Sequence, residues 1–324
     1  MLMRFLLTVC SMLLLSAAST QAQVQRAYVS ALSGDDANAA TNCAATAPCR
    51  WFAGAISVVA SGGEIVAMDS GAYGALAITK SISIVAAPGV YAGITVFSGS
   101  GVSIATAGVR VALRGLTING LGGSNGVNMS DGSSLVIDRC YFSNFTDGVY
   151  FTAAGKLRVV DSIFNGNGYG IQARGGTTTI TRSSFFENSY GAYVAATAGE
   201  TVVDVEKSVV SGSAASGFYV SAGSGATARL MVTESSVTGN VNGVFAYALS
   251  GGTVSTTVSN STLSHNTNAL RVDGGAVMVV SGNTVTRNSM GMVNFGSTLK
   301  SAGNNSVQEN VGNVSGAITN FDTM

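Results

Sequence analysis

The chain has 324 residues, of which 46% are hydrophobic and only 10% are charged, and it contains 42 glycines. This composition supplies a long buried core and is not that of a disordered chain. Sixteen basic residues balance sixteen acidic residues, so the chain offers no electrostatic footprint to nucleic acid or to an anionic membrane. We therefore expect one elongated domain with no nucleic-acid partner, and composition assigns it no oligomeric state.

Residues 1–22 predict a secretory signal peptide. Arg4 precedes an apolar run from Phe5 to Leu15, and small residues lead to Ala22, a pattern that places the cleavage before Gln23. The apolar run is too short to span a bilayer. A lipoprotein anchored through Cys10 is the weaker interpretation, because the apolar run continues past it. We expect the mature chain to be secreted or periplasmic, with no membrane span.

Residues 23–63 predict an N-terminal cap in front of a repetitive region over 64–324. Cys43 and Cys49 lie six residues apart, and export favours a disulfide between them. A redox or metal pair is the alternative, although the spacing is not CxxC and no histidine is near. Four apolar residues recur at the spacing of a short amphipathic helix: Trp51, Phe52, Ile56 and Val59. Such a helix suits the exposed end of a strand stack.

From residue 64 onward the chain repeats one template. Three copies read LVIDRCYFSNFTDGV, LRVVDSIFNGNGYGI and TTITRSSFFENSYGA, and their glycines at 148, 170 and 191 are 22 and 21 residues apart. That spacing is the period of a solenoid. Each copy holds three short stretches of alternating apolar residues separated by bends, which describes a parallel β-helix. In the first turns we expect strands at Glu64 to Met68, Leu76 to Ile84 and Gly93 to Phe97.

Individual slots of the template predict what each turn buries. An asparagine recurs three residues before the glycine position, at Asn167, Asn188, Asn240, Asn266, Asn288 and Asn310. Stacked amides hydrogen-bond along a stack and satisfy turn backbone, so we predict an asparagine ladder. A second slot holds small residues: Cys140, Ser162, Ser183, Ser208, Ser235 and Ser261. We interpret Cys140 as a buried member of this slot, not a nucleophile. The aromatic core residues are predicted to be Phe142, Phe164, Phe185 and Phe218.

The repeats resemble those of right-handed parallel β-helix proteins in the pectin-lyase-like superfamily, and the segment GGEIVAMDSGAYGALAITKSISIVAAPGVYAGITV is similar to the start of many bacterial members. The resemblance covers nearly the whole mature chain. It implies an all-β fold, a right-handed parallel β-helix of about eleven turns with a short N-terminal capping helix. It implies no single activity, because the superfamily includes lyases, hydrolases, epimerases and members with no known chemistry.

Carboxylates in this chain form no evident catalytic cluster. Superfamily enzymes place carboxylates on neighbouring turns, to hold calcium or to act as an acid/base pair. Here one bend carries charges of mostly alternating sign, which favours a solvated charge ladder: Asp138, Arg139, Asp161, Arg182, Lys207 and Glu234. Asp69 and Asp273 stand beside glycine turns, where aspartate commonly forms the turn, and His265 is interpreted as an exposed turn residue. We predict no catalytic residue, no metal site and no cofactor.

Two residues after each glycine position, strand alternation points the side chain outward. That position reads Asn128, Tyr150, Gln172, Tyr193, Tyr219, Phe245, Arg271 and Val293. Rings and planar polar groups at a regular pitch suit a carbohydrate groove. The predicted ligand-binding residues are therefore Tyr150, Gln172, Tyr193, Tyr219, Phe245 and Arg271. Longer inter-turn segments at 196–200, 221–229 and 248–252 are candidates for one wall of a cleft. The alternative is that these rings only stack on one another and strengthen the sheet.

These observations favour an exported, non-catalytic scaffold that binds a glycan or another surface polymer. The alternative is a polysaccharide lyase or glycoside hydrolase with a divergent active site, which rests on the fold alone. Convergence of outward aspartates and glutamates in the folded chain would favour that alternative.

Overall fold

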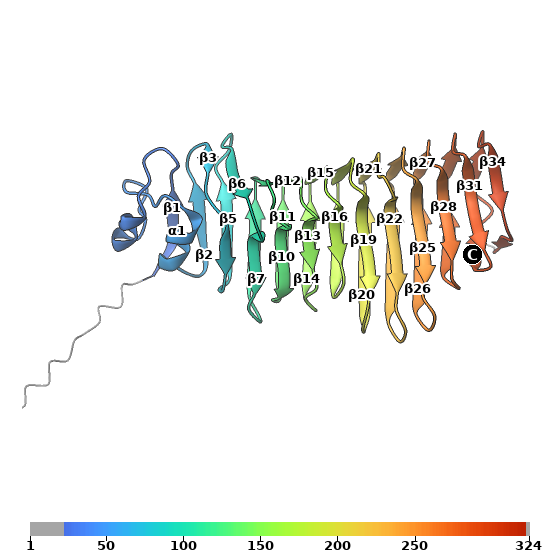
Figure 1. The fold of residues 1–324 in the computed structure, drawn as a ribbon, viewed down its shortest axis with the longest axis horizontal. Helices are drawn as coiled ribbons and strands as arrows, with labels where there is room; N and C mark the ends of the chain where they lie inside the picture. The colour runs from blue at the N-terminus through green and yellow to red at the C-terminus, as the bar shows by residue number, and fades with distance from the viewer. Residues whose placement is uncertain (1–22, 322–324) are drawn as a thin grey trace, which may run out of the picture.

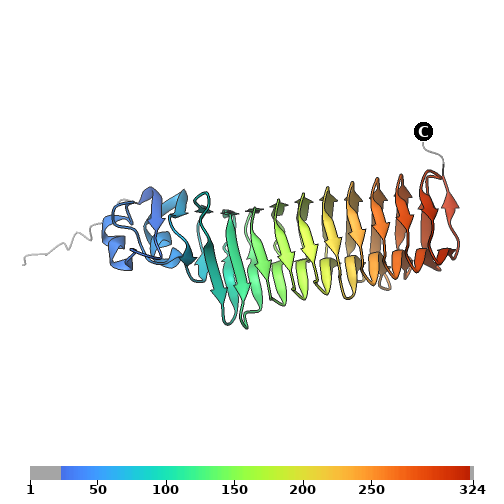
Figure 2. The same ribbon diagram turned by 90° about the horizontal axis from the view of Figure 1, so that it is seen from above.

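The computed structural model describes residues 23–321 as an elongated stack of strands with a small helical cap at the N-terminal end (Figure 1). The predicted signal peptide, with Cys10 inside it, lies outside the described residues. The strands form three parallel sheets of 13, 11 and 11 strands, and the view from above shows them in succession along one axis (Figure 2). The predicted all-β parallel β-helix is confirmed.

Sheet A holds the strand with which each turn begins: β1 (Val24–Val29), β2 (Val59–Ala67), β5 (Ile82–Ala86), β8 (Arg110–Arg114), β11 (Ser134–Asp138), β14 (Lys156–Val160), β17 (Thr177–Thr181), β20 (Glu200–Glu206), β23 (Thr227–Thr233), β26 (Thr253–Ser259), β29 (Val277–Ser281), β32 (Thr298–Ser301) and β35 (Thr319–Asn320).

Sheet B holds the short second strand: β3 (Gly71–Ala72), β6 (Ala92–Val96), β9 (Leu116–Gly120), β12 (Tyr141–Ser143), β15 (Ile163–Asn165), β18 (Ser184–Phe186), β21 (Val209–Ser211), β24 (Ser236–Thr238), β27 (Thr262–Ser264), β30 (Thr284–Thr286) and β33 (Ser306–Gln308).

Sheet C holds the third strand: β4 (Leu76–Ile78), β7 (Ser100–Ala105), β10 (Asn125–Asp131), β13 (Asp147–Phe151), β16 (Tyr169–Ala173), β19 (Tyr190–Ala196), β22 (Ser216–Ala222), β25 (Asn242–Ala248), β28 (Asn268–Asp273), β31 (Met290–Phe295) and β34 (Gly312–Ser315).

The core is a column of identical slots. Phe142, Phe164 and Phe185 are fully buried, and their rings stack with centroids 4.9 Å apart in both steps. Phe218 continues the column edge-on, 6.4 Å from Phe185. Such aromatic pairs add about 0.5–1.5 kcal/mol each beyond area burial. The four phenylalanines predicted for the core are confirmed.

Two hydrogen-bond ladders run along the stack at its corners. In the predicted asparagine ladder the Oδ1 atom of Asn188 accepts from Asn167, and that of Asn266 accepts from Asn240, from both backbone and side-chain nitrogens. The ladder continues through Asn288 to Asn310. Ser213 takes the slot between its two runs. The asparagine ladder is thus confirmed, with one interruption.

A second ladder is built from the small-residue slot. Each hydroxyl donates to the carbonyl two residues before it and accepts a backbone N–H from the preceding turn, as Ser162 does with Val160 (2.8 Å) and Cys140 (3.1 Å). Cys140 heads this ladder and is 2% exposed, and burial raises its pKa to about 12. A thiol in that state is a poor nucleophile at neutral pH, which agrees with its predicted structural role.

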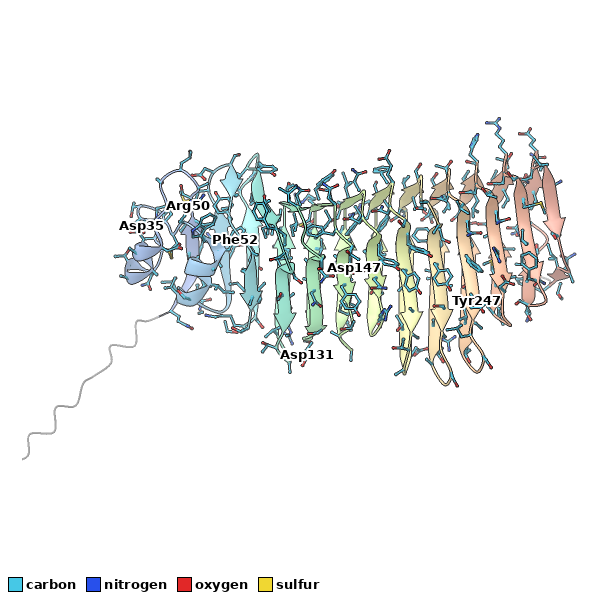
Figure 3. All side chains as sticks on the ribbon, in the orientation of Figure 1. Asp35, Arg50, Phe52, Asp131, Asp147 and Tyr247 are labelled. Atoms are coloured by element: carbon cyan, nitrogen blue, oxygen red, sulfur yellow. A yellow bond between two sulfur atoms is a disulfide. The ribbon has the colours of Figure 1, made fainter. Side chains whose placement is uncertain are left out.

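The N-terminal cap contains η1 (Asp36–Thr41), α1 (Phe52–Val58) and a disulfide between Cys43 and Cys49. Both cysteines are fully buried, so the predicted bond is present. The Asp36 Oδ1 atom accepts from the backbone of Arg50 at 2.8 Å, and Phe52 stacks on Tyr73 at 5.0 Å. The first contact ties the cap together and the second joins it to the first turns, where Arg50 and Phe52 lie close to β2 and β3 (Figure 3). Val59, predicted as the last apolar residue of the helix, instead opens β2.

One strand prediction was wrong. The stretch Leu76 to Ile84 was expected to be one strand, but it is divided between β4 in sheet C and β5 in sheet A. The chain turns a corner at 79–81, where the Lys80 Nζ atom donates to the Val59 carbonyl at 2.7 Å. No helix within residues 23–321 has both the length and the apolar character needed to cross a membrane.

Candidate functional site

The predicted outward row lies on the outer face of sheet C. Its members are register partners on successive strands, in the order Asn128, Tyr150, Gln172, Tyr193, Tyr219, Phe245, Arg271 and Val293. Parallel pairing therefore sets the rings about 4.8 Å apart along the stack. The structure thus brings all six predicted ligand-binding residues together on one face.

Additional rings widen this row into a patch. Tyr193 stacks on Tyr219 with centroids 4.9 Å apart, and Phe245 meets Tyr219 edge-on at 5.2 Å. Tyr169 and Tyr190, which open their strands, stack at 5.1 Å and pack edge-on against Tyr193. We call six rings the aromatic patch: Tyr169, Tyr190, Tyr193, Tyr219, Phe245 and Tyr247.

The rings of the row are neither fully buried nor fully exposed. Tyr150, Tyr193, Tyr219 and Phe245 all have intermediate exposure. Burial is nevertheless sufficient to raise the pKa of Tyr219 to about 12. The side chains therefore stack on one another, as the structural alternative requires, and still present part of each ring to solvent.

Two polar members of the row have partners already. Gln172 keeps its place in the row but is only 6% exposed. The Arg271 guanidinium lies over the Phe245 ring at 4.5 Å and forms an ion pair with Asp273 at 2.7 Å. Asp273 was predicted to form a turn, and its backbone carbonyl does accept from the Ala276 N–H. Asp273 therefore forms both the turn and the ion pair with Arg271.

A buried carboxylate stands at the edge of the aromatic patch. Asp147 is 8% exposed, and burial raises its pKa to about 6 while the charge of Arg174 opposes the shift. With the Gln172 amide oriented to satisfy both neighbours, its nitrogen donates to Asp147 at 3.0 Å and its oxygen accepts from Arg174 at 3.2 Å. The three side chains thus form a relay across β13 and β16. Figure 3 shows Asp147 and Tyr247 on the same face of the stack, separated along its axis.

Arg174 also lines a cleft of about 460 Å³ beside the patch. Tyr150 forms another part of the lining, and the segment 197–200 forms the far wall. Of the three segments predicted to form one wall, 196–200 therefore contributes to this cleft. The segments 221–229 and 248–252 are not part of this cleft's lining in the described chain.

Sequence reasoning missed Asp147, Arg174, Tyr169 and Tyr190. Asp147, Tyr169 and Tyr190 share one column of sheet C, directly before the glycine of each turn. The sequence shows this position as the middle residue of TDG, GYG and SYG, so the repeat could have identified it. Arg174 follows the end of β16, so only the fold shows that it reaches Gln172.

The other predicted polar positions have structural partners. Asp69 accepts from the Ala31 N–H and the Tyr73 hydroxyl, each at 2.7 Å. His265 is exposed in a left-handed turn, with its N–H donating to the Arg287 carbonyl. The predicted charge ladder is present as exposed ion pairs, among them Arg182–Asp161 at 2.8 Å and Lys207–Glu234 at 3.6 Å. Within residues 23–321, no three His, Cys, Asp or Glu side chains gather in a group able to hold a metal.

Three parallel sheets around a laddered core, with varied outward rows, define a β-helix repeat protein. Residues 90–230 match the family described as right handed beta helix region. The chain therefore contains a right-handed parallel β-helix with the pectin-lyase-like fold.

Comparison with solved structures gives the same fold. The A-module of a mannuronan C-5 epimerase from Azotobacter vinelandii aligns with a TM-score of 0.54 and 14% identity, covering 81% of this chain and 91% of that one. A pectate lyase aligns with a TM-score of 0.54 and 15% identity, covering 93% of this chain and 81% of that one. No curated protein matches the sequence. At these identities the likeness concerns the fold.

Proposed function

We propose that the protein is a non-catalytic scaffold that binds a polysaccharide, or another surface polymer, along the outer face of sheet C. The observation that carries the proposal is the aromatic patch, six partly exposed or edge-packed rings on four consecutive strands. Partly exposed rings gathered on one face of a folded chain support a binding surface there.

The physical basis is the match between a fixed row and a repeating ligand. Sugar rings present C–H faces that pack on aromatic rings, and such aromatic contacts contribute about 1 kcal/mol each beyond area burial. The rings of Tyr193 and Tyr219 already hold each other in place, so little side-chain entropy remains to be lost when a ligand binds. The cleft beside Tyr150 and Arg174 extends the surface and adds a guanidinium.

The names of the similar structures support a polymer as the ligand class. The names mannuronan epimerase and pectate lyase both refer to a polysaccharide, and both proteins have this fold. Their chemistry does not transfer at this identity, and the residues that carry the binding proposal are those of the aromatic patch.

Export is part of the proposal. The support is the pattern of residues 1–22 and the buried disulfide of the cap, which is a bond of oxidising compartments. Cell fractionation with N-terminal sequencing tests it: the mature chain should begin at Gln23 and be found outside the cytoplasm. A full-length cytoplasmic chain contradicts it.

Binding is tested with a glycan array on the mature chain, followed by titration of the best ligand. Tyr193→Ala and Tyr219→Ala should each weaken binding about fivefold, the equivalent of about 1 kcal/mol. Tyr91→Ala is the matched control, since Tyr91 is an exposed tyrosine outside sheet C, and its affinity should stay unchanged. Equal affinities in all three variants, with lower melting temperatures only for Tyr193→Ala and Tyr219→Ala, would leave the rings a purely structural role.

One observation favours the enzymatic alternative, a divergent polysaccharide lyase or hydrolase. Burial raises the pKa of Asp147 to about 6. The Gln172 amide connects this carboxylate to Arg174, which lines the cleft. A carboxylate tuned in this direction suits a general acid or base near neutral pH. Assays for reducing ends and unsaturated products, run on the wild type and on Asp147→Asn, distinguish the two functions. Product that depends on Asp147 would replace the scaffold proposal.

A further inference from the structure

A second cleft lies at the corner between sheets A and B, away from the aromatic patch. Its volume is about 380 Å³, and four arginines line it: Arg114, Arg139, Arg158 and Arg182. We call these four residues the arginine cleft. Asp138 and Asp161 stand among them, and Val136 and Val160 complete the lining. The arginines come from four successive turns, whose strands are register partners in sheet A.

The backbone at this corner holds charged residues in a conformation that favours glycine. Gly115 and Gly282 occupy the bend slot with φ of 69° and 66°, whereas Arg139, Asp161 and Arg182 occupy it with φ of 52°, 49° and 47°. A left-handed residue other than glycine costs roughly 1 kcal/mol or more. The same slot holds Lys207 and Glu234 beyond the cleft, with φ of 50° and 49°, so charged side chains stand at this bend over several successive turns.

The charges of the cleft do not cancel. Asp161 pairs with Arg182 in a bidentate contact of 2.8 and 3.0 Å. Asp138 is shared between Arg139 at 3.2 Å and Arg114 at 3.9 Å. Arg158 has no ion-pair partner among residues 23–321. Four guanidiniums against two carboxylates leave two unbalanced positive charges, in a chain whose total charge is zero.

We propose that the arginine cleft binds a phosphate monoester. A phosphate monoester carries about −1.5 to −2 charges at neutral pH, which matches the unbalanced charge of the cleft. Guanidinium forks bind phosphate oxygens in pairs. Arg158 supplies an unpaired fork, and Arg139 supplies a second when the phosphate takes the place of Asp138. A monoanionic carboxylate would leave one of these charges uncompensated. This site is separate from the polymer surface on sheet C and does not depend on it.

The bidentate contact to Asp161 also prepares the cleft. It holds Arg182 in one orientation, so that less side-chain freedom is lost when an anion enters. Asp138 acts in the opposite direction, because it competes with a ligand for Arg114 and Arg139. Neutralising Asp161 should therefore weaken anion binding, whereas neutralising Asp138 should strengthen it.

The test is calorimetric titration of the mature chain at low salt with inorganic phosphate and with a hexose 6-phosphate. The free hexose and galacturonic acid serve as comparison ligands. We expect the hexose 6-phosphate to bind, with an affinity that falls as ionic strength rises and as the phosphate gains its second proton below about pH 6.

Three variants make the test decisive. Arg158→Gln should weaken binding by about tenfold or more, the loss of one charged hydrogen-bonding group, while Asp138→Asn should strengthen it. Arg287→Gln is the control, an exposed arginine paired with Glu309 elsewhere on the stack, and should leave binding unchanged. No binding of either phosphate, equal binding to Arg158→Gln, or tighter binding of galacturonic acid would each overturn the proposal. None of these outcomes depends on the polymer-binding surface.

Discussion

Replacing Asn266 with leucine tests whether the asparagine ladder holds the stack together. Asn266 is 2% exposed. Its Oδ1 atom accepts from the backbone and side-chain nitrogens of Asn240, both at 3.0 Å. Its Nδ2 atom donates to the Val237 carbonyl and to Asn288, again at 3.0 Å. One side chain thus joins three consecutive turns.

The magnitude follows from the groups that leucine would leave without partners. The Asn240 N–H and the Val237 carbonyl stay buried after the substitution, and each unsatisfied group costs about 1–3 kcal/mol. Asn288 keeps a second donor, because its Oδ1 atom also accepts from the Asn266 backbone N–H. Burial of leucine carbons returns about 1–2 kcal/mol. We expect a net loss of about 2–4 kcal/mol in the free energy of unfolding.

The assay is urea denaturation of the mature chain, with the midpoint and slope compared between variants. Asn310→Leu is the matched control, because Asn310 ends the ladder and is only partly buried. The Asn310 side chain joins only the turn before it, through the Asn288 N–H and the Val285 carbonyl, so we expect a smaller loss than for Asn266→Leu. An unchanged midpoint for Asn266→Leu, or equal losses at both positions, would refute the reasoning.

Three further predictions concern single buried groups. Ser213 interrupts the asparagine ladder with a buried, unpartnered hydroxyl, so Ser213→Asn should connect its two runs and raise the free energy of unfolding by about 1 kcal/mol, measured by the same denaturation. Burial raises the pKa of Asp147 to about 6, above its unfolded value near 3.9, so the folded state holds that proton more tightly. The associated stability is full below about pH 4 and is lost as pH rises through about 6, by about 1–2 kcal/mol after allowance for solvent screening. Asp147→Asn should remove this part of the pH profile, and an unaltered profile would exclude Asp147 as its source. Cys140 is buried and Cys43 and Cys49 are bonded, so alkylation of the native chain should label none of them, and rapid labelling of any one would contradict the structure.

The repetitive part of the fold was predictable because its inward slots recur. Phe142, Phe164 and Phe185 occupy one slot and stack as expected. The same repeat predicted that Tyr193 and Tyr219 lie side by side, and they are register partners in sheet C. Prediction failed where the frame is irregular, at Leu76 to Ile84, since a corner inside an apolar run has no signature in alternation.

The candidate sites were only partly predictable, because they combine residues from different slots. Gln172 occupies an outward position of the alternation, but it is buried in contact with Asp147 and Arg174. Arg158 lies in the interior of β14, and its register partners on either side are Val136 and Thr179. Because the neighbouring turns carry no charge at this position, the sequence repeat does not single it out. Only folding brings Arg158 beside the bend residues Arg139 and Arg182.

These failures have one physical cause. Inward positions must satisfy the same packing and hydrogen bonding in every turn, so they repeat and can be read from the sequence. Outward positions face solvent and are free to differ, and each departure from the repeat is a place where the chain adds chemistry. Asp147 among tyrosines and Arg158 between a valine and a threonine are two such departures. The column around each one, more than the residue itself, is therefore where we propose that this stack binds its ligands.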